Sequence, residues 1–334
     1  MRSSGDSRLR NRVAIVTGAS SGVGWQSAVR LAGAGVRLCI TARRADALEK
    51  LRAQVVHGGG ECLVVPGDVT VEADVERVVA QCLERYERID MLVNCAAVQS
   101  YAPFEHYEWR EILRVFDVTC FGYMRFARAV LPHFRVQGHG HIINVLSMLS
   151  KGAAPLLSAY TAAKHATFGW AESLRLELAG SGIEVSGVLV PSVATPMFDH
   201  APTKLGFAPR PVPPTYDPDV AARAVLECAR RPHPAKVPVF LQGSFILWLQ
   251  RWAPWVGETI LKKWGVRLQT REVRLSRPEG NLFQPIPEGV GPYGSVPPTP
   301  AWQRFCVSAV IWALAAAGVF AGALLIQRLA RFAR

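Results

Sequence analysis

The sequence predicts an α/β protein with a doubly wound parallel sheet of seven strands. Two observations lead to this prediction. Short apolar runs alternate with longer segments of helical periodicity, the order in which helices cover both faces of a parallel sheet. The first run also breaks into a glycine-rich turn that leads directly into a helix. The expected strands lie near residues 13–17, 36–41, 62–66, 90–93, 140–146, 183–190 and 237–241.

The glycine turn follows the first strand and reads Thr17-Gly18-Ala19-Ser20-Ser21-Gly22-Val23-Gly24. Glycine lets the backbone approach a pyrophosphate closely, and the N-terminus of the next helix offers that group unpaired N–H donors and a positive dipole end. The turn therefore predicts a Rossmann-type nucleotide-binding site. A glycine turn without a nucleotide is the alternative, but the strand and the helix lie where the motif requires them.

The second expected strand runs into Arg43 and Arg44. An acidic residue there would accept hydrogen bonds from the ribose of NAD(H), whereas arginine pairs with the 2′-phosphate of NADP(H). The two arginines therefore favour NADP(H), with NAD(H) as the less favoured cofactor. They also open a polar helix at residues 45–56, so the alternative is that both are solvated surface residues.

A tyrosine and a lysine lie four residues apart at Tyr160 and Lys164, which places them on one face of a helix. Tyrosine titrates near 10, and a nearby ammonium favours its phenolate. Such a pair can donate and accept a proton near neutral pH. This spacing alone also occurs by chance on solvated helices, and it is the nucleotide-binding turn that favours the catalytic interpretation.

Together these motifs resemble the short-chain dehydrogenase/reductase family, in its single-domain branch, over about residues 10–245. Ser147 lies thirteen residues before Tyr160, as the family's catalytic serine does; Asn94-Cys95-Ala96-Ala97 resembles its N-N-A-G segment, and Pro191-Ser192 its Pro-Gly. The resemblance implies that Tyr160 is the general acid/base and that Ser147 polarises the reacting oxygen. It also implies that Lys164 lowers the pKa of Tyr160 and holds the nicotinamide ribose.

The resemblance further implies the residues that contact the cofactor. Among them, Asp68 would meet the exocyclic amine of adenine. The set comprises Gly18, Ser20, Ser21, Gly22, Val23, Gly24, Arg43, Arg44, Asp68, Val69, Asn94, Ala96, Tyr160, Lys164, Pro191 and Thr195.

One position departs from the family pattern. Three residues before the glycine of the helix at 115–122, the family usually has an asparagine, which is thought to hold a water beside the lysine in a proton relay; here that residue is Thr119. A threonine hydroxyl can still bind a water, with a shorter reach and fewer hydrogen bonds. Thr119 is therefore a candidate catalytic residue, and we expect the change to affect the turnover rate more than the reaction type.

Composition narrows the possible partners. The net charge is +12, but the arginines are dispersed and no nucleic-acid recognition motif accompanies them, so a membrane surface explains the excess better than nucleic acid. The seven scattered cysteines include no C-x-x-C pair, which is typical of reduced thiols. The eight histidines lack ligand spacing, so no metal site is expected. Residues 1–11 form a polar tail without a secretory signal.

The catalytic domain is expected over residues 12–243, which leaves a C-terminal extension. Residues 305–326 contain 22 residues of which only Ser308 is polar, long enough as a helix to cross a hydrocarbon core of about 30 Å. We therefore expect a transmembrane helix at 304–328 and a basic tail at 329–334. A buried core helix is the alternative. Gly318 and Gly322 could seat a second helix, so a homodimer is possible.

Two segments connect the catalytic domain to this span. Residues 244–266 interleave tryptophans with basic residues, which suits the interface layer of a membrane. Packing onto the protein's own core is the alternative. Residues 267–303 form a Pro/Gly-rich linker, expected to lie extended against the domain or the membrane.

The sequence thus predicts an NADP(H)-dependent oxidoreductase that interconverts a carbonyl and a secondary alcohol and is anchored by a single C-terminal span, with its catalytic domain facing the cytoplasm. The membrane address favours a lipophilic ketone or alcohol as substrate. The alternative is a non-catalytic nucleotide-binding or scaffold protein on the same fold, suggested by Thr119 and Ser192. An intact Ser147, Tyr160 and Lys164 argue against it. Family members that epimerise or dehydrate sugar nucleotides need a larger substrate domain.

Overall fold

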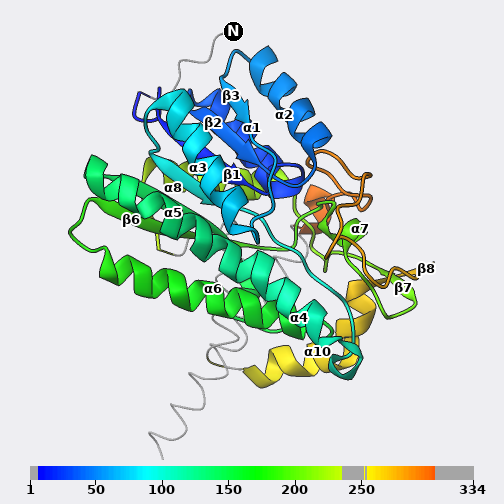
Figure 1. Ribbon diagram of the computed structural model, residues 1–334. Helices are drawn as coiled ribbons and strands as arrows, with labels where there is room; N and C mark the ends of the chain where they lie inside the picture. Colours follow the sequence, from blue (N-terminus) through cyan, green and yellow to red (C-terminus); the bar gives the residue numbers. More distant parts are fainter. Residues whose placement is uncertain (1–6, 235–251, 253, 305–334) are drawn as a thin grey trace, which may run out of the picture.

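The computed structural model describes residues 7–234, 252 and 254–304 (Figure 1). The strands of the main sheet are β1 (Val13–Thr17), β2 (Arg37–Thr41), β3 (Cys62–Val64), β4 (Met91–Asn94), β5 (Gly140–Ser147) and β6 (Ile183–Val190). The helices are α1 (Gly22–Gly33), α2 (Ala45–His57), α3 (Glu72–Tyr86), α4 (Trp109–Phe116), α5 (Gly122–Gln137), α6 (Ser158–Glu177), α7 (Met197–His200), α8 (Pro218–Arg230) and α10 (Pro254–Gln269).

The main sheet is parallel, in the order β3-β2-β1-β4-β5-β6. The strand order reverses between β1 and β4, and this is the switch point at which doubly wound sheets bind ligands. The α/β prediction is therefore confirmed, with six strands in the described sheet rather than seven. The seventh expected strand, at 237–241, lies outside the described residues.

Alternating residues of each strand feed two separate cores, because a parallel sheet in this fold is covered on both faces. Val13 and Ile15 of β1 pack with residues of α3, α5 and α6. Ala14 and Val16 pack with residues of α1, α2 and α8 on the opposite face. Figure 1 shows these helices as two layers around the sheet. The continuous apolar runs of the sequence are explained by this burial.

The C-terminal part of the described chain returns to the catalytic domain. β7 (Phe207–Pro209) and β8 (Thr270–Arg274) pair antiparallel and join this part to the segment after β6. Beyond β8, residues 277–300, orange in Figure 1, run beside α7. We call residues 281–291 the C-terminal strap. Its Leu282 is fully buried in the core that includes Val69 and Val118, so this part of the expected linker packs against the domain, whereas residues 267–274 belong to α10 and β8.

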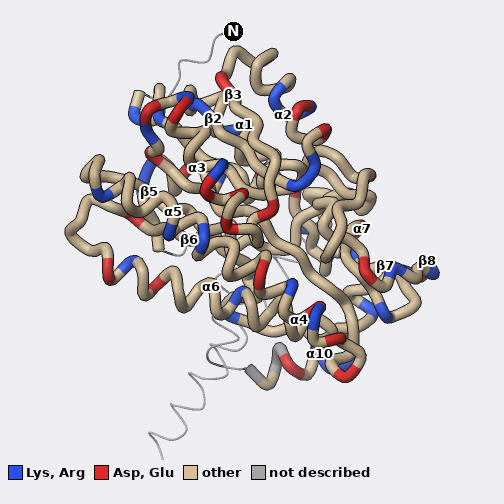
Figure 2. The backbone as a smooth tube through the Cα atoms, in the orientation of Figure 1, with Lys and Arg blue, Asp and Glu red and all other residues tan. Residues whose placement is uncertain are grey.

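Charged residues of both signs are interspersed over the described chain (Figure 2). Several form ion pairs across elements; for example, Arg30 of α1 lies 2.6 Å from Asp219 of α8. No described helix is both long and apolar enough to cross a bilayer. The expected span falls at 304–328, of which the structure describes only Arg304.

Candidate active site

A cavity of about 570 Å³ lies beside the carboxyl ends of the strands. The glycine turn after β1 lines one end, and the ends of β4 and β5, the start of α6 and the loop after β6 line other parts. Nearly all predicted site residues border it. The exceptions are Asn94, which bonds to Asn144 at 3.0 Å in the interior, and Thr119.

The turn requires glycine because it packs against other backbone. Gly18 has φ +65°, and a Cβ there would lie 2.7 Å from the Cα of Ala96. A Cβ on Gly24 would lie 2.4 Å from the carbonyl oxygen of Gly18. Thr17 ties the turn to the end of β4, since its Oγ1 accepts a hydrogen bond from the Cys95 N–H at 3.1 Å. The N-terminus of α1 is thereby presented to the cavity, as a pyrophosphate requires.

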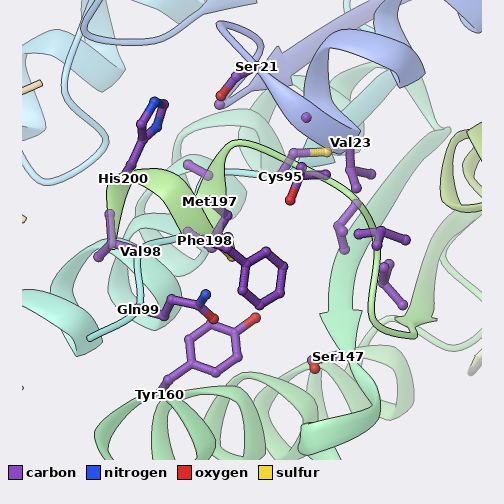
Figure 3. A pocket seen from close by; sticks show the side chains of 18 of the residues that line it. Ser21, Val23, Cys95, Val98, Gln99, Ser147, Tyr160, Met197, Phe198 and His200 are labelled. Atoms are coloured by element: carbon purple, nitrogen blue, oxygen red, sulfur yellow. The ribbon is translucent and has the colours of Figure 1, made fainter. Parts of the chain in front are cut away.

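Ser147 and Tyr160 border the same part of the cavity from two elements (Figure 3). Ser147 is the last residue of β5, and Tyr160 lies in the first turn of α6. One turn further along α6, the ammonium of Lys164 donates to the carbonyl oxygen of Val145 at 2.8 Å and to the hydroxyl of Tyr123 at 3.3 Å. It lies 5.9 Å from the centre of the Tyr160 ring. The fold thus brings the predicted trio together.

Burial shifts the pKa values of Tyr160 and Lys164 in opposite directions. It raises the pKa of Tyr160 to about 12, against a smaller opposite effect of the hydrogen bond with Ser147. Burial also lowers the pKa of Lys164 to about 7. The expected lowering of the Tyr160 pKa by Lys164 is therefore not seen in the protein alone, because the same low-dielectric surroundings disfavour both charged forms.

Thr119 holds a loop rather than lining the cavity. It lies in a π-helical turn, Asp117–Phe121, between α4 and α5. Its hydroxyl accepts from the N–H of Val98 and donates to the carbonyl oxygen of Val98, both at 3.2 Å. Its own carbonyl accepts from the hydroxyl of Thr167 at 3.1 Å. The hydroxyl that the sequence assigned to a relay water is thus engaged by the backbone after β4.

Arg43 and Arg44 border the cavity, but their guanidinium groups bind the C-terminal strap. Arg43 donates to the carbonyl oxygens of Asn281 at 2.7 Å and Phe283 at 3.0 Å. Arg44 donates to the carbonyl oxygen of Glu288 at 2.9 Å and to further strap carbonyls. Burial lowers the pKa of both arginines. These contacts join residues about 240 positions apart, which local sequence patterns could not reveal.

Asp68 also borders the cavity, with both carboxylate oxygens engaged. Oδ2 accepts from Arg114 at 2.6 Å, and Oδ1 accepts from the N–H of Thr70 at 3.0 Å and from its hydroxyl at 2.8 Å. Burial alone would raise the pKa of Asp68, but these hydrogen bonds hold it below its ordinary value. The residue expected to meet adenine therefore already has close partners within the protein.

The lining residues that sequence reasoning missed include Gln99 and Tyr101 after β4 and two groups from the C-terminal extension. The strap contributes Asn281, Pro285 and Ile286, and α10 contributes Leu261, Leu268 and Gln269. Gln269 is buried; its Nε2 donates to the carbonyl oxygens of Pro155 and Gly265, while its Oε1 has no partner in the described part of the chain. A Pro/Gly-rich or amphipathic pattern carries no signal for such contacts, because the tertiary fold alone brings these residues to the cavity.

Comparisons with known proteins agree with this geometry. A family model described as short chain dehydrogenase matches residues 12–205. The uncharacterized oxidoreductase YxnA of Bacillus subtilis is 32% identical over 229 residues, which cover 67% of this chain and 64% of that protein. The match thus spans a little less than two thirds of that relative.

Solved structures share the fold. A short chain dehydrogenase/reductase from Burkholderia phymatum in complex with NAD superposes with a TM-score of 0.67 at 21% identity, over 75% of this chain and 97% of that one. A metagenomic short-chain oxidoreductase in complex with NADP gives a TM-score of 0.58 at 27% identity, over 69% of this chain and 96% of that one.

Proposed function

The chain belongs to the short-chain dehydrogenase family, and on that basis we propose that it is an NADP(H)-dependent oxidoreductase that interconverts a carbonyl and a secondary alcohol on a lipophilic substrate. The observation that carries the proposal is that one cavity has the glycine turn along one part and the hydroxyls of Ser147 and Tyr160 along another. A dinucleotide held at the turn would supply or accept the hydride.

Tyr160 and Ser147 handle the oxygen of the substrate in this proposal. During reduction the phenol of Tyr160 donates its proton to the carbonyl oxygen, and during oxidation it accepts the proton of the alcohol. Ser147 donates a hydrogen bond to the same oxygen, which stabilises the charge that develops there. Lys164, with Val145 and Tyr123 as its partners, is placed to add positive charge behind Tyr160.

A largely apolar lining supports a lipophilic substrate. The residues around the cavity beyond the glycine turn include Leu149, Leu157, Phe198, Leu261 and Leu268. Burying an apolar substrate against such side chains contributes roughly 25 cal/mol per Å² removed from water. A polar sugar nucleotide would leave its hydroxyls without partners on most of this surface.

The surroundings of Arg43 and Arg44 support NADP(H). Within the described residues neither guanidinium forms an ion pair with a carboxylate; their partners are carbonyl oxygens and the hydroxyl of Ser20. A partly buried Arg43 and a buried Arg44, both with neutral partners, favour an incoming anion, and a 2′-phosphate brings about two negative charges.

The exposed side of α10 supports a membrane contact. Trp255 and Trp264 of α10 and the neighbouring Trp252 are all exposed, and Lys262 and Lys263 lie beside them. Aromatic rings and cations in this arrangement suit the headgroup layer. The sequence of residues 305–326 supports a span beyond it.

The proton transfer is tested by Tyr160→Phe. We expect turnover to fall by roughly 10³-fold or more, while the dissociation constant for NADPH changes less than about threefold, since only the transferable proton is removed. Tyr86→Phe is the matched control, because the Tyr86 hydroxyl donates to the carbonyl oxygen of Leu38, away from the cavity. Turnover in Tyr160→Phe comparable to the control would contradict the mechanism.

Cofactor preference is tested by Arg43→Asp. Calorimetry on the unaltered protein should show tighter binding of NADPH than NADH, and Arg43→Asp should erase or reverse the difference, because a carboxylate repels the 2′-phosphate. Arg52→Asp, on the exposed side of α2, controls for the change in net charge. Equal affinity of the unaltered protein for the two cofactors would show that Arg43 does not read the phosphate.

A further inference from the structure

The C-terminal strap forms a wall of the cavity beside the glycine turn. Asn281, Pro285 and Ile286 line the cavity together with Arg43, Arg44, Asp68 and Val69. This is the end of a doubly wound site that takes the adenosine part of a dinucleotide, because it lies beside the end of β2 and the loop after β3. The strap therefore adds side chains at the adenosine end.

The strap is held firmly at this place. Leu282 is fully buried in the core. Its carbonyl oxygen accepts from Nε of Arg114 at 2.9 Å, and the carbonyl oxygen of Asn281 accepts from Arg43 at 2.7 Å. The N–H of Asn281 donates to the carbonyl oxygen of His200 at 3.0 Å. With the backbone of Asn281 bound on both sides, its side chain has a defined position at the cavity.

The side chain of Asn281 carries an unmet hydrogen-bonding demand. Its Oδ1 is buried and has no hydrogen-bond partner among the residues that the structure describes, although Asn281 borders the cavity. Buried acceptors of this kind are rare in native proteins, because leaving one unpaired forfeits its hydrogen bond to water. Asn281 lines the cavity, so a donor on a bound ligand would satisfy this acceptor once the amide group turns toward the ligand.

The carboxylate of Asp68 is poorly placed to receive such a donor. Arg114 occupies one oxygen and Thr70 the other. The same Arg114 also binds the carbonyl oxygen of Leu282, so the arginine that engages Asp68 is the one that fixes the strap next to Asn281. Among the described residues that line this end of the cavity, Asn281 is the one whose side-chain oxygen is buried without a hydrogen-bond partner.

We propose that Asn281 recognises the adenine base of the cofactor, with its Oδ1 accepting a hydrogen bond from the exocyclic amine. An asparagine amide suits adenine, because its oxygen can accept from the amine while its nitrogen donates to a neighbouring ring nitrogen. The inference rests on the proposed function, since it needs a dinucleotide in the cavity. It makes the C-terminal extension part of the cofactor site.

The test compares two dinucleotides that differ only at the amine. NADPH and its hypoxanthine counterpart, in which a carbonyl replaces the amine, are titrated into the full-length protein by fluorescence. The unaltered protein should bind NADPH more tightly, by roughly five- to tenfold for one hydrogen bond. In Asn281→Leu the two affinities should become equal, mainly through weaker NADPH binding.

Two further variants separate recognition from a general disturbance of the strap. Asn281→Asp keeps an acceptor and loses the donor, so the preference for NADPH should persist or increase. Gln284→Leu changes an exposed amide on the same strap and should leave both affinities unchanged. Melting curves of all variants check that each is folded.

The outcomes distinguish this inference from the proposed function. Asn281→Leu with an undiminished preference for NADPH would overturn the role of Asn281, and so would an unaltered protein that binds both dinucleotides equally. An unaltered protein that binds neither dinucleotide would instead contradict the proposed function.

Discussion

At the scale of single residues, burial sets the protonation states of the proposed catalytic groups. Tyr160 and Lys164 are both inside the protein, where each neutral form is favoured. Their spacing in the sequence predicted that they share a helix face, and α6 confirms it. The direction of the pKa shifts could not be predicted, because it depends on surroundings such as Val145 and Tyr123 that come from other elements.

Lys164 should therefore make the stability of the ligand-free protein depend on pH. The pKa of Lys164 is about 7 in the folded protein and near 10.5 in the unfolded chain, so the unfolded chain binds more protons between these values. Stability consequently rises with pH across this window, and the full penalty applies below pH 7.

Replacing this lysine should remove the penalty. Lys164→Met should raise the melting temperature of the ligand-free protein at pH 6.5 by roughly 5 °C, and the gain should shrink by pH 9. Calorimetric melting at both pH values measures it, with Lys50→Met on the exposed side of α2 as control. A gain of equal size at both pH values would show that Lys164 is charged in the folded protein throughout.

At the scale of elements, the sequence predicted structure that depends on contacts between neighbouring residues, but not structure that depends on contacts between residues far apart in the chain. The strand, turn and helix around Gly18 could be predicted, because the turn's chemistry is local. The π-helical turn at Thr119 could not, since it is held by hydrogen bonds to Val98 and Thr167, which lie 21 and 48 positions away. The sequence identified Thr119 as unusual for the family, whereas its hydrogen bonds with Val98 could be found only from the three-dimensional structure.

The clamp between Thr119 and Val98 should contribute to stability. Thr119→Val should lower the free energy of unfolding by about 1–3 kcal/mol, because the buried N–H and C=O of Val98 lose their partner. Urea denaturation measures the change. Thr161→Val is a matched control in α6: the Oγ1 of Thr161 is buried and has no partner among the described residues, so removing the hydroxyl should be neutral or stabilising. An equal loss of unfolding free energy in both variants would contradict a stabilising role for the hydrogen bonds between Thr119 and Val98.

At the scale of the whole molecule, the C-terminal extension is joined to the catalytic domain rather than appended to it. Residues 10–245 could be recognised from their motifs, and the parallel sheet follows from alternating elements. The wall formed by α10 and the strap could not be predicted, because Leu282 and Gln269 are ordinary residues in segments without regular motifs. Their roles come from packing against elements more than 100 positions away.

The proposed membrane span beyond this wall poses a question of orientation. Close to residues 305–326 there is one basic residue before the span, Arg304, and there are three after it, Arg328, Arg331 and Arg334. The positive-inside rule alone would therefore keep the tail in the cytoplasm. The proposed use of NADPH and the expected reduced thiols favour the catalytic domain on that side as well, and a single crossing cannot satisfy both.

We propose one crossing with the catalytic domain in the cytoplasm, because the proposed cofactor and the expected reduced thiols both favour that side for the domain. A cysteine placed beyond Arg331 should then react with a membrane-impermeant thiol reagent applied to intact cells. A cysteine at Glu49, on the exposed side of α2, should react only after permeabilisation.

Removal of residues 301–334 should release much of the protein from carbonate-washed membranes. Labelling of the tail cysteine only after permeabilisation would place the tail on the same side as the catalytic domain and argue for a segment that enters the membrane without crossing it.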